Sequence, residues 1–253
     1  MVMLGCGTSS GVPRIGGDWG ACDPADPRNA RSRASIIVAS ETTTILVDTG
    51  PDMRAQLLAS RINMVDAVIW THEHADHTHG IDDLRQIYHV KGAPVPGYAR
   101  PDTLAVLEQR FGYVFTGRYG YPPTAEAHRL ADYMMIGDIR VRSVDQPHGE
   151  ITSAGLRFEH GRFSIGYSTD FNAMTDEMAE LYQHLDLWVV DALRRRPHPT
   201  HAHLAATLGW IAHAAPKRAV LTHMDQSMDY AALAADLPRG IEPGYDGLEV
   251  VLT

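Results

Sequence analysis

The sequence predicts an α/β fold in which sheets are flanked by helical layers. Two patterns lead to this prediction. Short runs rich in β-branched residues come in pairs early in the chain, and later runs of the same kind alternate with helix-like segments. A chain of 253 residues with 44% hydrophobic residues can bury the core of one large domain. We therefore expect a single domain over residues 1–253, without internal repeats.

The predicted strands are short and end in turn-forming residues. In chain order they cover residues 35–39, 43–47, 65–70, 156–159, 163–167, 187–190, 219–221 and 248–252. The pair at 156–159 and 163–167 flanks His160-Gly161, which predicts a hairpin.

The predicted helices follow the apolar period of an α-helix. Apolar residues recur at this spacing in two segments, at Met178, Leu181, Tyr182 and Leu185 and at Leu204, Leu208, Ile211 and Ala212. A third helix is predicted over residues 230–237.

Residues 92–129 differ from the rest of the chain. They are rich in proline and glycine and hold six aromatics, Tyr98, Phe111, Tyr113, Phe115, Tyr119 and Tyr121. One interpretation is a helical insertion whose aromatics form a small local core. The other is a lid beside the active site, in which the tyrosines stack a nucleobase.

Composition indicates which partners and which cellular compartment to expect for this protein. The formal net charge of -9 gives no general attraction for a nucleic-acid backbone, so we expect no bulk DNA as partner. Only Cys6 and Cys22 are present, which favours a reducing compartment over a disulfide framework. We see no targeting segment and no membrane-spanning run, so we expect a cytoplasmic protein without membrane contact.

Histidine is the unusual residue, with 14 copies, and four metal-ligand side chains gather directly after the predicted strand at 65–70. Imidazole nitrogens and carboxylate oxygens are the usual donors to zinc, manganese or iron. A solvated polar loop is the alternative, but it would not need so dense a set. The four side chains are those of His72, His74, Asp76 and His77.

Three later residues can complete the ligand sets. His148, Asp170 and His223 each follow a predicted strand. Any one of them alone would be read as a structural or surface residue. Because strand ends converge along one edge of a sheet, we expect them to meet the first cluster there.

This pattern resembles the metallo-β-lactamase superfamily. The H-x-H-x-D-H motif at residues 72–77 carries the resemblance, together with the three later donors and the upstream Leu-Val-Asp-Thr-Gly at 46–50. The resemblance implies a four-layer αββα sandwich with two divalent ions, zinc or manganese, at one edge. It assigns His72, His74 and His148 to one ion, Asp76, His77 and His223 to the other, and Asp170 to both. Asp48 would orient ligands without binding metal.

Three further segments, at residues 4–13, 80–85 and 243–248, resemble one branch of that superfamily. The branch contains the cyclic phosphodiesterase of the carbon–phosphorus lyase pathway and is related to the tRNA 3′-processing nucleases. In it a histidine upstream of the last ligand assists catalysis, and His201 occupies that position. A surface histidine in a proline-rich loop is the alternative for His201.

The chain also departs from that branch. A structural zinc there is held by three cysteines and a histidine, and the corresponding residues here are Gly17, Trp19, Cys22 and Gln226. We therefore expect no structural zinc. His203 replaces a serine two residues after His201.

These residues lead us to expect a phosphodiesterase acting on a small cyclic ribosyl or nucleoside phosphodiester, with a hydroxide shared by the two ions as nucleophile. Asp76 and His201 would be catalytic, with His201 as the general acid. Arg85 and His203 would contact the substrate, although a salt bridge and a surface position are their alternatives. We allow for a homodimer.

Four other functions are alternatives for a chain with this pattern. A thioester hydrolase of the glyoxalase II type would use the same ions. An oxygen-reducing di-iron protein is disfavoured because the second residue of its motif is typically a glutamate, whereas this chain has His74 there. A non-catalytic binding module is disfavoured because it would not need seven metal ligands. A tRNA nuclease is disfavoured because it would need a basic arm to hold RNA, and the sequence shows no obvious one. A dinucleotide site at Gly5, Gly7 and Gly11 is rejected, since Pro13 stands where its helix should begin.

Overall fold

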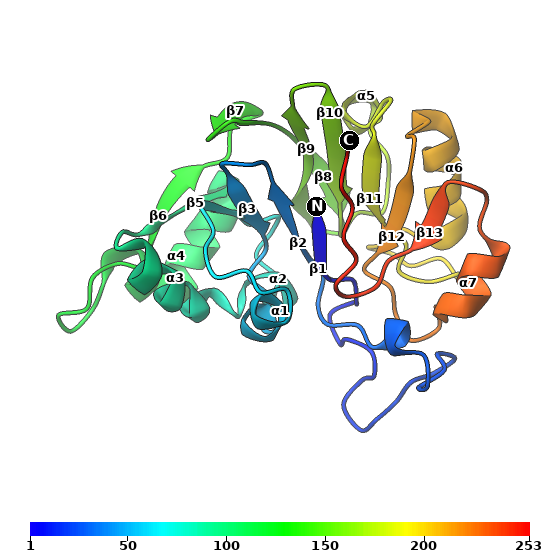
Figure 1. The fold of residues 1–253 in the computed structure, drawn as a ribbon, viewed down its shortest axis with the longest axis horizontal. Coiled ribbons are helices and arrows are strands. Elements are labelled where there is room, and N and C mark those ends of the chain that lie inside the picture. Colours follow the sequence, from blue (N-terminus) through cyan, green and yellow to red (C-terminus); the bar gives the residue numbers. More distant parts are fainter.

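The computed structural model describes residues 1–253 as two stacked sheets (Figure 1). The six-stranded sheet has the order β1-β2-β3-β4-β5-β6. Its strands are β1 (Val2–Gly5), β2 (Ser35–Ala39), β3 (Thr44–Val47), β4 (Ala67–Ile69), β5 (Val95–Ala99) and β6 (Ala125–Arg129). The strands from β1 to β3 pair antiparallel, and those from β3 to β6 pair parallel.

The seven-stranded sheet has the order β13-β12-β11-β10-β9-β8-β7. Its strands are β7 (Tyr133–Ile136), β8 (Ile139–His148), β9 (Ile151–His160), β10 (Phe163–Ser168), β11 (Leu187–Asp191), β12 (Ala219–Thr222) and β13 (Ile241–Pro243). An antiparallel meander from β7 to β10 continues as parallel strands from β10 to β13.

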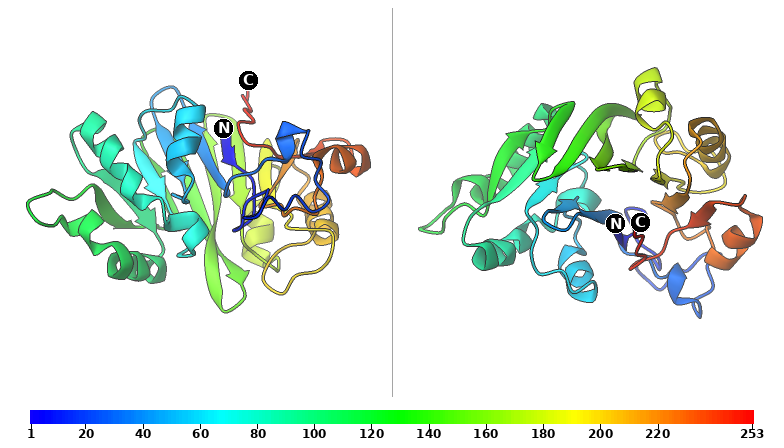
Figure 2. Two further views of the ribbon diagram at one scale, coloured as in Figure 1. Left: turned by 90° about the horizontal axis from the view of Figure 1, so that it is seen from below. Right: turned by 45° about the horizontal axis from the view of Figure 1, so that its top comes forward.

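Helices cover the outer faces of both sheets (Figure 2). The first sheet carries α1 (Met53–Ala59), α3 (Leu84–Lys91) and α4 (Pro101–Thr116), and the second carries α5 (Asp176–Leu181), α6 (Leu204–Ala214) and α7 (Tyr230–Asp236). The short elements are α2 (Ala75–Thr78), η1 (Pro27–Asn29) and η2 (Ile81–Asp83). None of these helices combines the length and the apolar character that crossing a bilayer requires.

The alternation of side chains along the strands explains the layers. In β2, Ile36 and Val38 belong to the main core of 39 buried residues, whereas Ile37 belongs to a second core of 16. The second core also contains Leu57 of α1 and Leu107 of α4, so it fills the space under these helices. Because successive strand residues face opposite sides of a sheet, one face of the first sheet meets its helices and the other meets the second sheet. The predicted four-layer αββα sandwich is confirmed.

One predicted strand is wrong. Residues 248–252 form only an isolated bridge between Val2 and Glu249, and the strand in this region is β13. The backbone does pair briefly with β1, since Met3 N–H donates to Leu248 O and Val250 N–H to Met1 O. Val251 is 78% exposed, so its apolar side chain does not mark a buried strand.

The segment 92–129 is more regular than its composition indicates. It holds β5, α4 and β6, and both strands belong to the six-stranded sheet. Its aromatics divide into two groups. Phe111 and Phe115 pack against the second core, whereas Tyr119 and Tyr121 are 84% and 74% exposed.

Candidate metal centre

The first set of donors follows β4 without a gap. Residues 70–74 continue the extended chain, and α2 begins at Ala75. His72 and His74 therefore precede the helix, while Asp76 and His77 lie within its single turn. This change of backbone conformation lets one short segment face two neighbouring positions.

The remaining donors lie at the ends of strands in the second sheet. His148 is the last residue of β8, Asp170 lies two residues beyond β10, and His223 directly follows β12. Asp170 and His223 have φ angles of 55° and 56°, which turn the chain sharply where each strand stops. Left-handed backbone is costly for residues other than glycine, and such residues concentrate at functional sites.

The structure brings all seven predicted donors together at one edge of the sandwich. They form two groups in which one donor atom of each residue lies within 4.8 Å of the others. The groups are His72, His74, His148 and Asp170, and Asp76, His77 and His223. Asp170 also reaches the second group, because its Oδ2 is 3.1 Å from His77 Nε2 and its Oδ1 is 3.5 Å from His223 Nε2.

Four ring nitrogens in this cluster lack hydrogen-bond partners. The Nε2 atoms of His72 and His77 and both ring nitrogens of His223 are buried without a hydrogen bond. Buried polar atoms in native proteins are almost always satisfied, so these nitrogens call for another partner. A divalent cation fits, since imidazole nitrogens and carboxylate oxygens are the donors that zinc and manganese take.

Hydrogen bonds on the far side of the rings orient them. Asp48 Oδ2 lies 2.7 Å from His77 Nδ1, and Thr71 donates to Asp48 from both its amide and its hydroxyl. His148 Nδ1 lies 2.8 Å from the carbonyl of Thr200. These contacts direct the Nε2 atoms of His77 and His148 into the cluster, as expected for metal-binding imidazoles.

The electrostatics of the cluster favour a cation. Burial raises the pKa of Asp170, but His223 and His77 lower it more, so the pKa of this carboxyl lies well below its usual range. Burial lowers the pKa of His223, yet Asp170 and Asp76 raise it to about 9. The carboxylates therefore remain ionised in the interior, where a positive charge stabilises them.

His201 lies beside the cluster and is paired with an acid that sequence analysis missed. Its Nδ1 is 3.3 Å from Oδ2 of Asp191 and 3.6 Å from Oδ1 of Asp170. Asp191 is buried at the end of β11, and its Oδ2 also accepts from the Asp170 amide at 3.1 Å. Its position at a strand end, shared with the other donors, was the available signal.

Comparison with known proteins identifies the family. The family described as the beta-lactamase superfamily domain matches residues 43–224. A crystal structure described as a new diphosphatase from the PhnP family superposes with a TM-score of 0.90 at 35% identity, covering 99% of this chain and 96% of that one. The chain belongs to the metallo-β-lactamase superfamily. Within that superfamily it falls in the PhnP-like branch that the sequence resembles.

Further similar proteins are longer than this chain or less similar to it. An octanoyltransferase from Porphyromonas gingivalis is 32% identical over 267 residues, which cover 99% of this chain and 51% of the relative. The exodeoxyribonuclease WalJ of Streptococcus pneumoniae is 26% identical over 62% of this chain and 57% of its own length. The chain thus spans about half the length of the curated relatives it matches. PqqB from Methylobacterium extorquens, with a TM-score of 0.80 at 19% identity and 99% coverage of both chains, shares the fold.

Two predicted substrate contacts lie outside the donor groups. Arg85 lines a separate pocket with Tyr113 and Arg118. His203 is the N-cap residue of α6, and its side chain makes no capping hydrogen bond. At the positions where the branch has its structural zinc, Cys22 Sγ lies 3.7 Å from a guanidinium nitrogen of Arg31.

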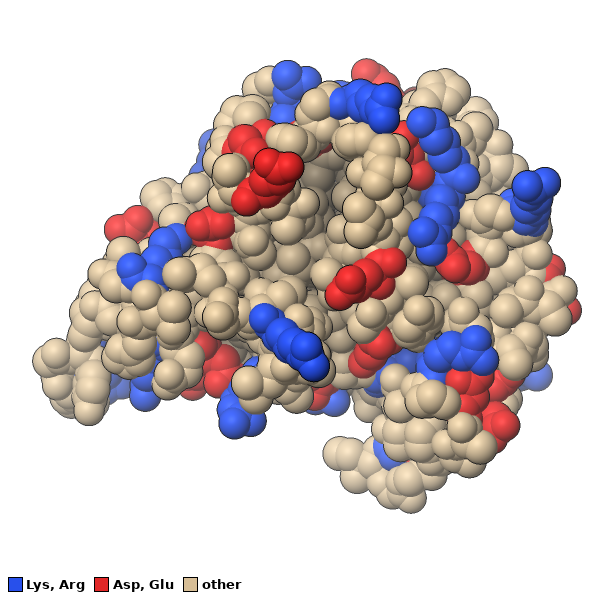
Figure 3. Space-filling view, in the orientation of Figure 1, with Lys and Arg blue, Asp and Glu red and all other residues tan.

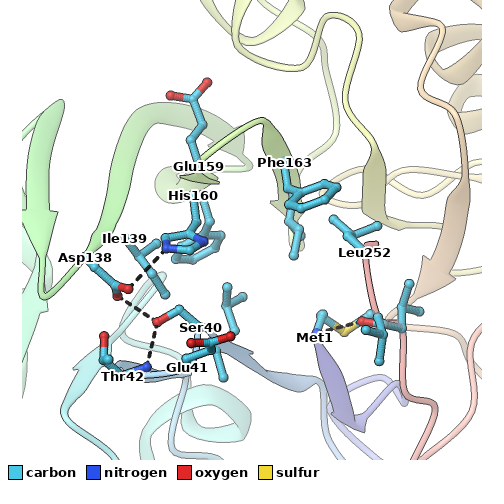
Figure 4. Close-up of a pocket in the computed structure, with 16 residues that line it drawn as sticks. Met1, Ser40, Glu41, Thr42, Asp138, Ile139, Glu159, His160, Phe163 and Leu252 are labelled. Atoms are coloured by element: carbon cyan, nitrogen blue, oxygen red, sulfur yellow. Dashed lines mark hydrogen bonds and ion pairs between the residues drawn. The ribbon is translucent and has the colours of Figure 1, made fainter.

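An apolar pocket of about 500 Å³ opens at the opposite edge of the sandwich (Figure 4). Its polar groups satisfy one another, since Asp138 lies 3.2 Å from His160 and accepts from Ser40 at 2.7 Å, while Glu159 points away from the cavity. Its lining has no cluster of metal-ligand side chains like the one at the other edge.

Proposed function

We propose that this protein is a dinuclear metal-dependent phosphodiesterase that acts on a small cyclic ribosyl or nucleoside phosphodiester. One observation carries the proposal. Two groups of nitrogen and oxygen donors lie side by side, Asp170 of the first group reaches His77 and His223 of the second, and several of the buried ring nitrogens have no hydrogen-bond partner within the protein.

The proposed ligand sets follow the two groups. His72, His74 and His148 would hold one ion and Asp76, His77 and His223 the other, with Asp170 within reach of both sets. Divalent ions in such a site activate water for attack and offset the negative charge that develops on a phosphate. Zinc and manganese both accept this combination of imidazole and carboxylate.

His201 supplies the proton that the leaving alkoxide needs. Its Nδ1 faces Asp191, so Nε2 remains free to donate. The Asp191 carboxylate holds the ring in that orientation. Asp76 stays ionised, because His77 and His223 lower its pKa more than burial raises it, and its carboxylate would orient the attacking water.

The names of similar proteins favour a phosphoester as the substrate. The relatives named above include an exodeoxyribonuclease and a diphosphatase, whose names describe attack at phosphorus. On the face shown in Figure 3, Lys and Arg residues are scattered among Asp and Glu residues, with one short basic run at the upper right. This distribution supports a small ester over a long nucleic-acid track.

The test is hydrolysis of bis(p-nitrophenyl) phosphate by metal-stripped protein reconstituted separately with manganese and zinc. We expect metal-dependent release that Asp170→Asn abolishes and that His213→Ala, an exposed histidine on α6, leaves unchanged. A panel of ribosyl cyclic phosphates, a nucleoside diphosphate ester, a single-stranded oligonucleotide and a glutathione thioester then identifies the substrate class. Turnover of the thioester alone, with two ions bound, would overturn the phosphodiesterase assignment.

A further inference from the structure

A second concave site lies at the C-terminal end of α4. It is a pocket of about 260 Å³ between the start of α3, the end of α4 and the loop 117–124. Its lining combines two arginines with three tyrosines, which are Arg85, Arg118, Tyr113, Tyr119 and Tyr121. The structure thus joins Arg85 and the tyrosines of the segment 92–129, which are separated in sequence, in one pocket.

The two guanidinium groups in this pocket have no carboxylate partner. Neither Arg85 nor Arg118 has a carboxylate within 4.0 Å, although eight other arginines of the chain form such pairs. The one acidic residue in the lining is Asp82, and its Oδ1 accepts the Tyr113 hydroxyl at 2.6 Å. The pocket therefore carries a net positive charge on a chain whose formal charge is -9.

The loop that closes the pocket is held in one backbone conformation by close contacts and hydrogen bonds. Gly117 has a φ of 70°, and a Cβ there would lie 2.3 Å from the carbonyl of Tyr121. Tyr119 adopts a left-handed φ of 52°, which is costly for a residue with a side chain. The amides and carbonyls of Arg118 and Tyr121 bond to each other in both directions. Strain of this kind is retained where the resulting geometry serves a purpose.

That geometry presents an aromatic surface backed by a cation. The Arg118 guanidinium carbon lies 4.7 Å from the centroid of the Tyr119 ring. One face of the ring is thus covered by the guanidinium, and 84% of the Tyr119 residue surface remains exposed. Stacking on tyrosine combined with arginine is a common way for proteins to hold nucleobases.

We propose that this pocket binds a mononucleotide, with the base stacked on the tyrosines and the phosphate held by Arg85 and Arg118. A concave site of this volume suits a small ligand, whereas a protein partner would use a flatter and larger surface. The binding does not depend on hydrolysis at the metal centre. It requires only that the ligand carry an aromatic ring and an anionic group at the same time.

The experiment is calorimetric titration of the full chain, in the presence of a chelator, with adenosine 5′-monophosphate, adenosine and ribose 5-phosphate. We expect the monophosphate to bind at least tenfold more tightly than either fragment. Arg118→Ala and Tyr119→Ala, both changes on an exposed loop, should each weaken its binding about tenfold. Tyr133→Ala is the matched control, because Tyr133 is also exposed and also has an arginine over its ring, but lies outside the pocket.

Asp170→Asn separates this site from the metal centre and should bind the monophosphate as the unaltered protein does. Loss of binding in Asp170→Asn, or unchanged binding in Tyr119→Ala, would place the nucleotide elsewhere and overturn the proposal. So would the absence of any binding. A dimer in sedimentation that Tyr119→Ala converts to a monomer would show that a second copy of the chain covers the pocket instead.

Discussion

At the scale of single residues, the site combines donors that are adjacent along the chain with Asp191, which contacts His201 from a different element. His72, His74 and His77 lie in one short motif, so their proximity follows from the chain itself. Asp191 stands alone in an apolar strand, and its role depends on a contact with His201 that only the fold creates. A sequence can reveal donors that are adjacent along the chain, whereas isolated acids need the tertiary structure.

His201 provides the first prediction at this scale. His201→Ala should lower kcat for a cyclic ribosyl phosphate by about 10²–10⁴-fold, because the alkoxide then leaves without a proton. The same change should matter much less for bis(p-nitrophenyl) phosphate, since p-nitrophenolate leaves unprotonated. Metal content, measured by elemental analysis, should stay constant. An equal loss on both substrates would contradict the role of proton donor.

At the scale of elements, close backbone contacts hold α2 in position. A Cβ on Gly80 would lie 2.1 Å from the carbonyl of Gly50, and one on Gly50 would lie 2.3 Å from the carbonyl of Asp76. The turn after β3 therefore packs directly on the segment that carries Asp76 and His77. Neither glycine has a left-handed φ, so space, and not backbone conformation, requires glycine at both positions.

Gly80→Ala should destabilise the protein by about 1–3 kcal/mol, because the added methyl group has no room. It should also weaken metal binding, measured by titration with manganese, since α2 has to move. Gly209→Ala is the matched control. That glycine is exposed in α6 with nothing within 4 Å of a Cβ, so alanine should stabilise the fold by about 1 kcal/mol. Equal effects of the two changes in urea unfolding would refute this explanation.

Asp186 connects the starts of three parallel strands. It accepts from the amide of Ser164 at 2.8 Å and from Lys217 at 2.6 Å. Burial raises the pKa of Asp186, but Lys217 and Ser164 lower it more, so its folded-state pKa lies below 3.8. A depressed carboxyl pKa stabilises the fold above the unfolded-state value, and this contribution disappears as the pH falls through the folded-state value.

Asp186→Asn should therefore reduce the free energy of unfolding at pH 7 by about 1–2 kcal/mol. The difference in stability between the variant and the unaltered protein should narrow from pH 7 toward pH 2, as the Asp186 carboxylate takes up a proton. Urea unfolding of metal-free protein at the two pH values measures the difference. Asp132→Asn, at a side chain that is 85% exposed, should have little effect at either pH. A deficit that persists undiminished in acid would exclude the charge as its cause.

Two of the strands that sequence analysis missed, β5 and β6, share a physical reason. β5 contains Pro96 and Gly97, and β6 is short and mostly exposed, so neither has the apolar alternation of a typical strand. Both become strands because β4 offers a free edge to pair with. By contrast, the buried runs at β2, β11 and β12 carry enough β-branched residues to be recognised within a residue or two.

At the scale of the whole molecule, the metal centre joins the two sheets. His72 to His77 follow a strand of the first sheet, whereas His148, Asp170 and His223 follow strands of the second. Ions held between them would connect halves that otherwise meet through apolar packing. Binding to the folded state alone at about 1,000 times Kd adds about 4 kcal/mol of stability.

Removal of metal by a chelator should consequently lower the Tm by about 10 °C, given about 2–4 °C per kcal/mol for a domain of this size. Readdition of manganese or zinc should restore it. Calorimetric scans of the two forms provide the measurement, and Asp170→Asn should show no chelator-dependent shift. Identical scans for the stripped and reconstituted protein would mean that the ions do not join the sheets.

The two ends of the chain lie side by side, with the Met1 amine donating to Val250 O at 2.9 Å (Figures 1 and 2). Both line the apolar pocket near His160, at the start of β10, whereas Asp170 lies past the other end of that strand, about 20 Å away. A fluorescent protein or a surface linker attached at either end would stand clear of the metals. The fold thus lends itself to immobilisation, with the reactive edge facing the solution.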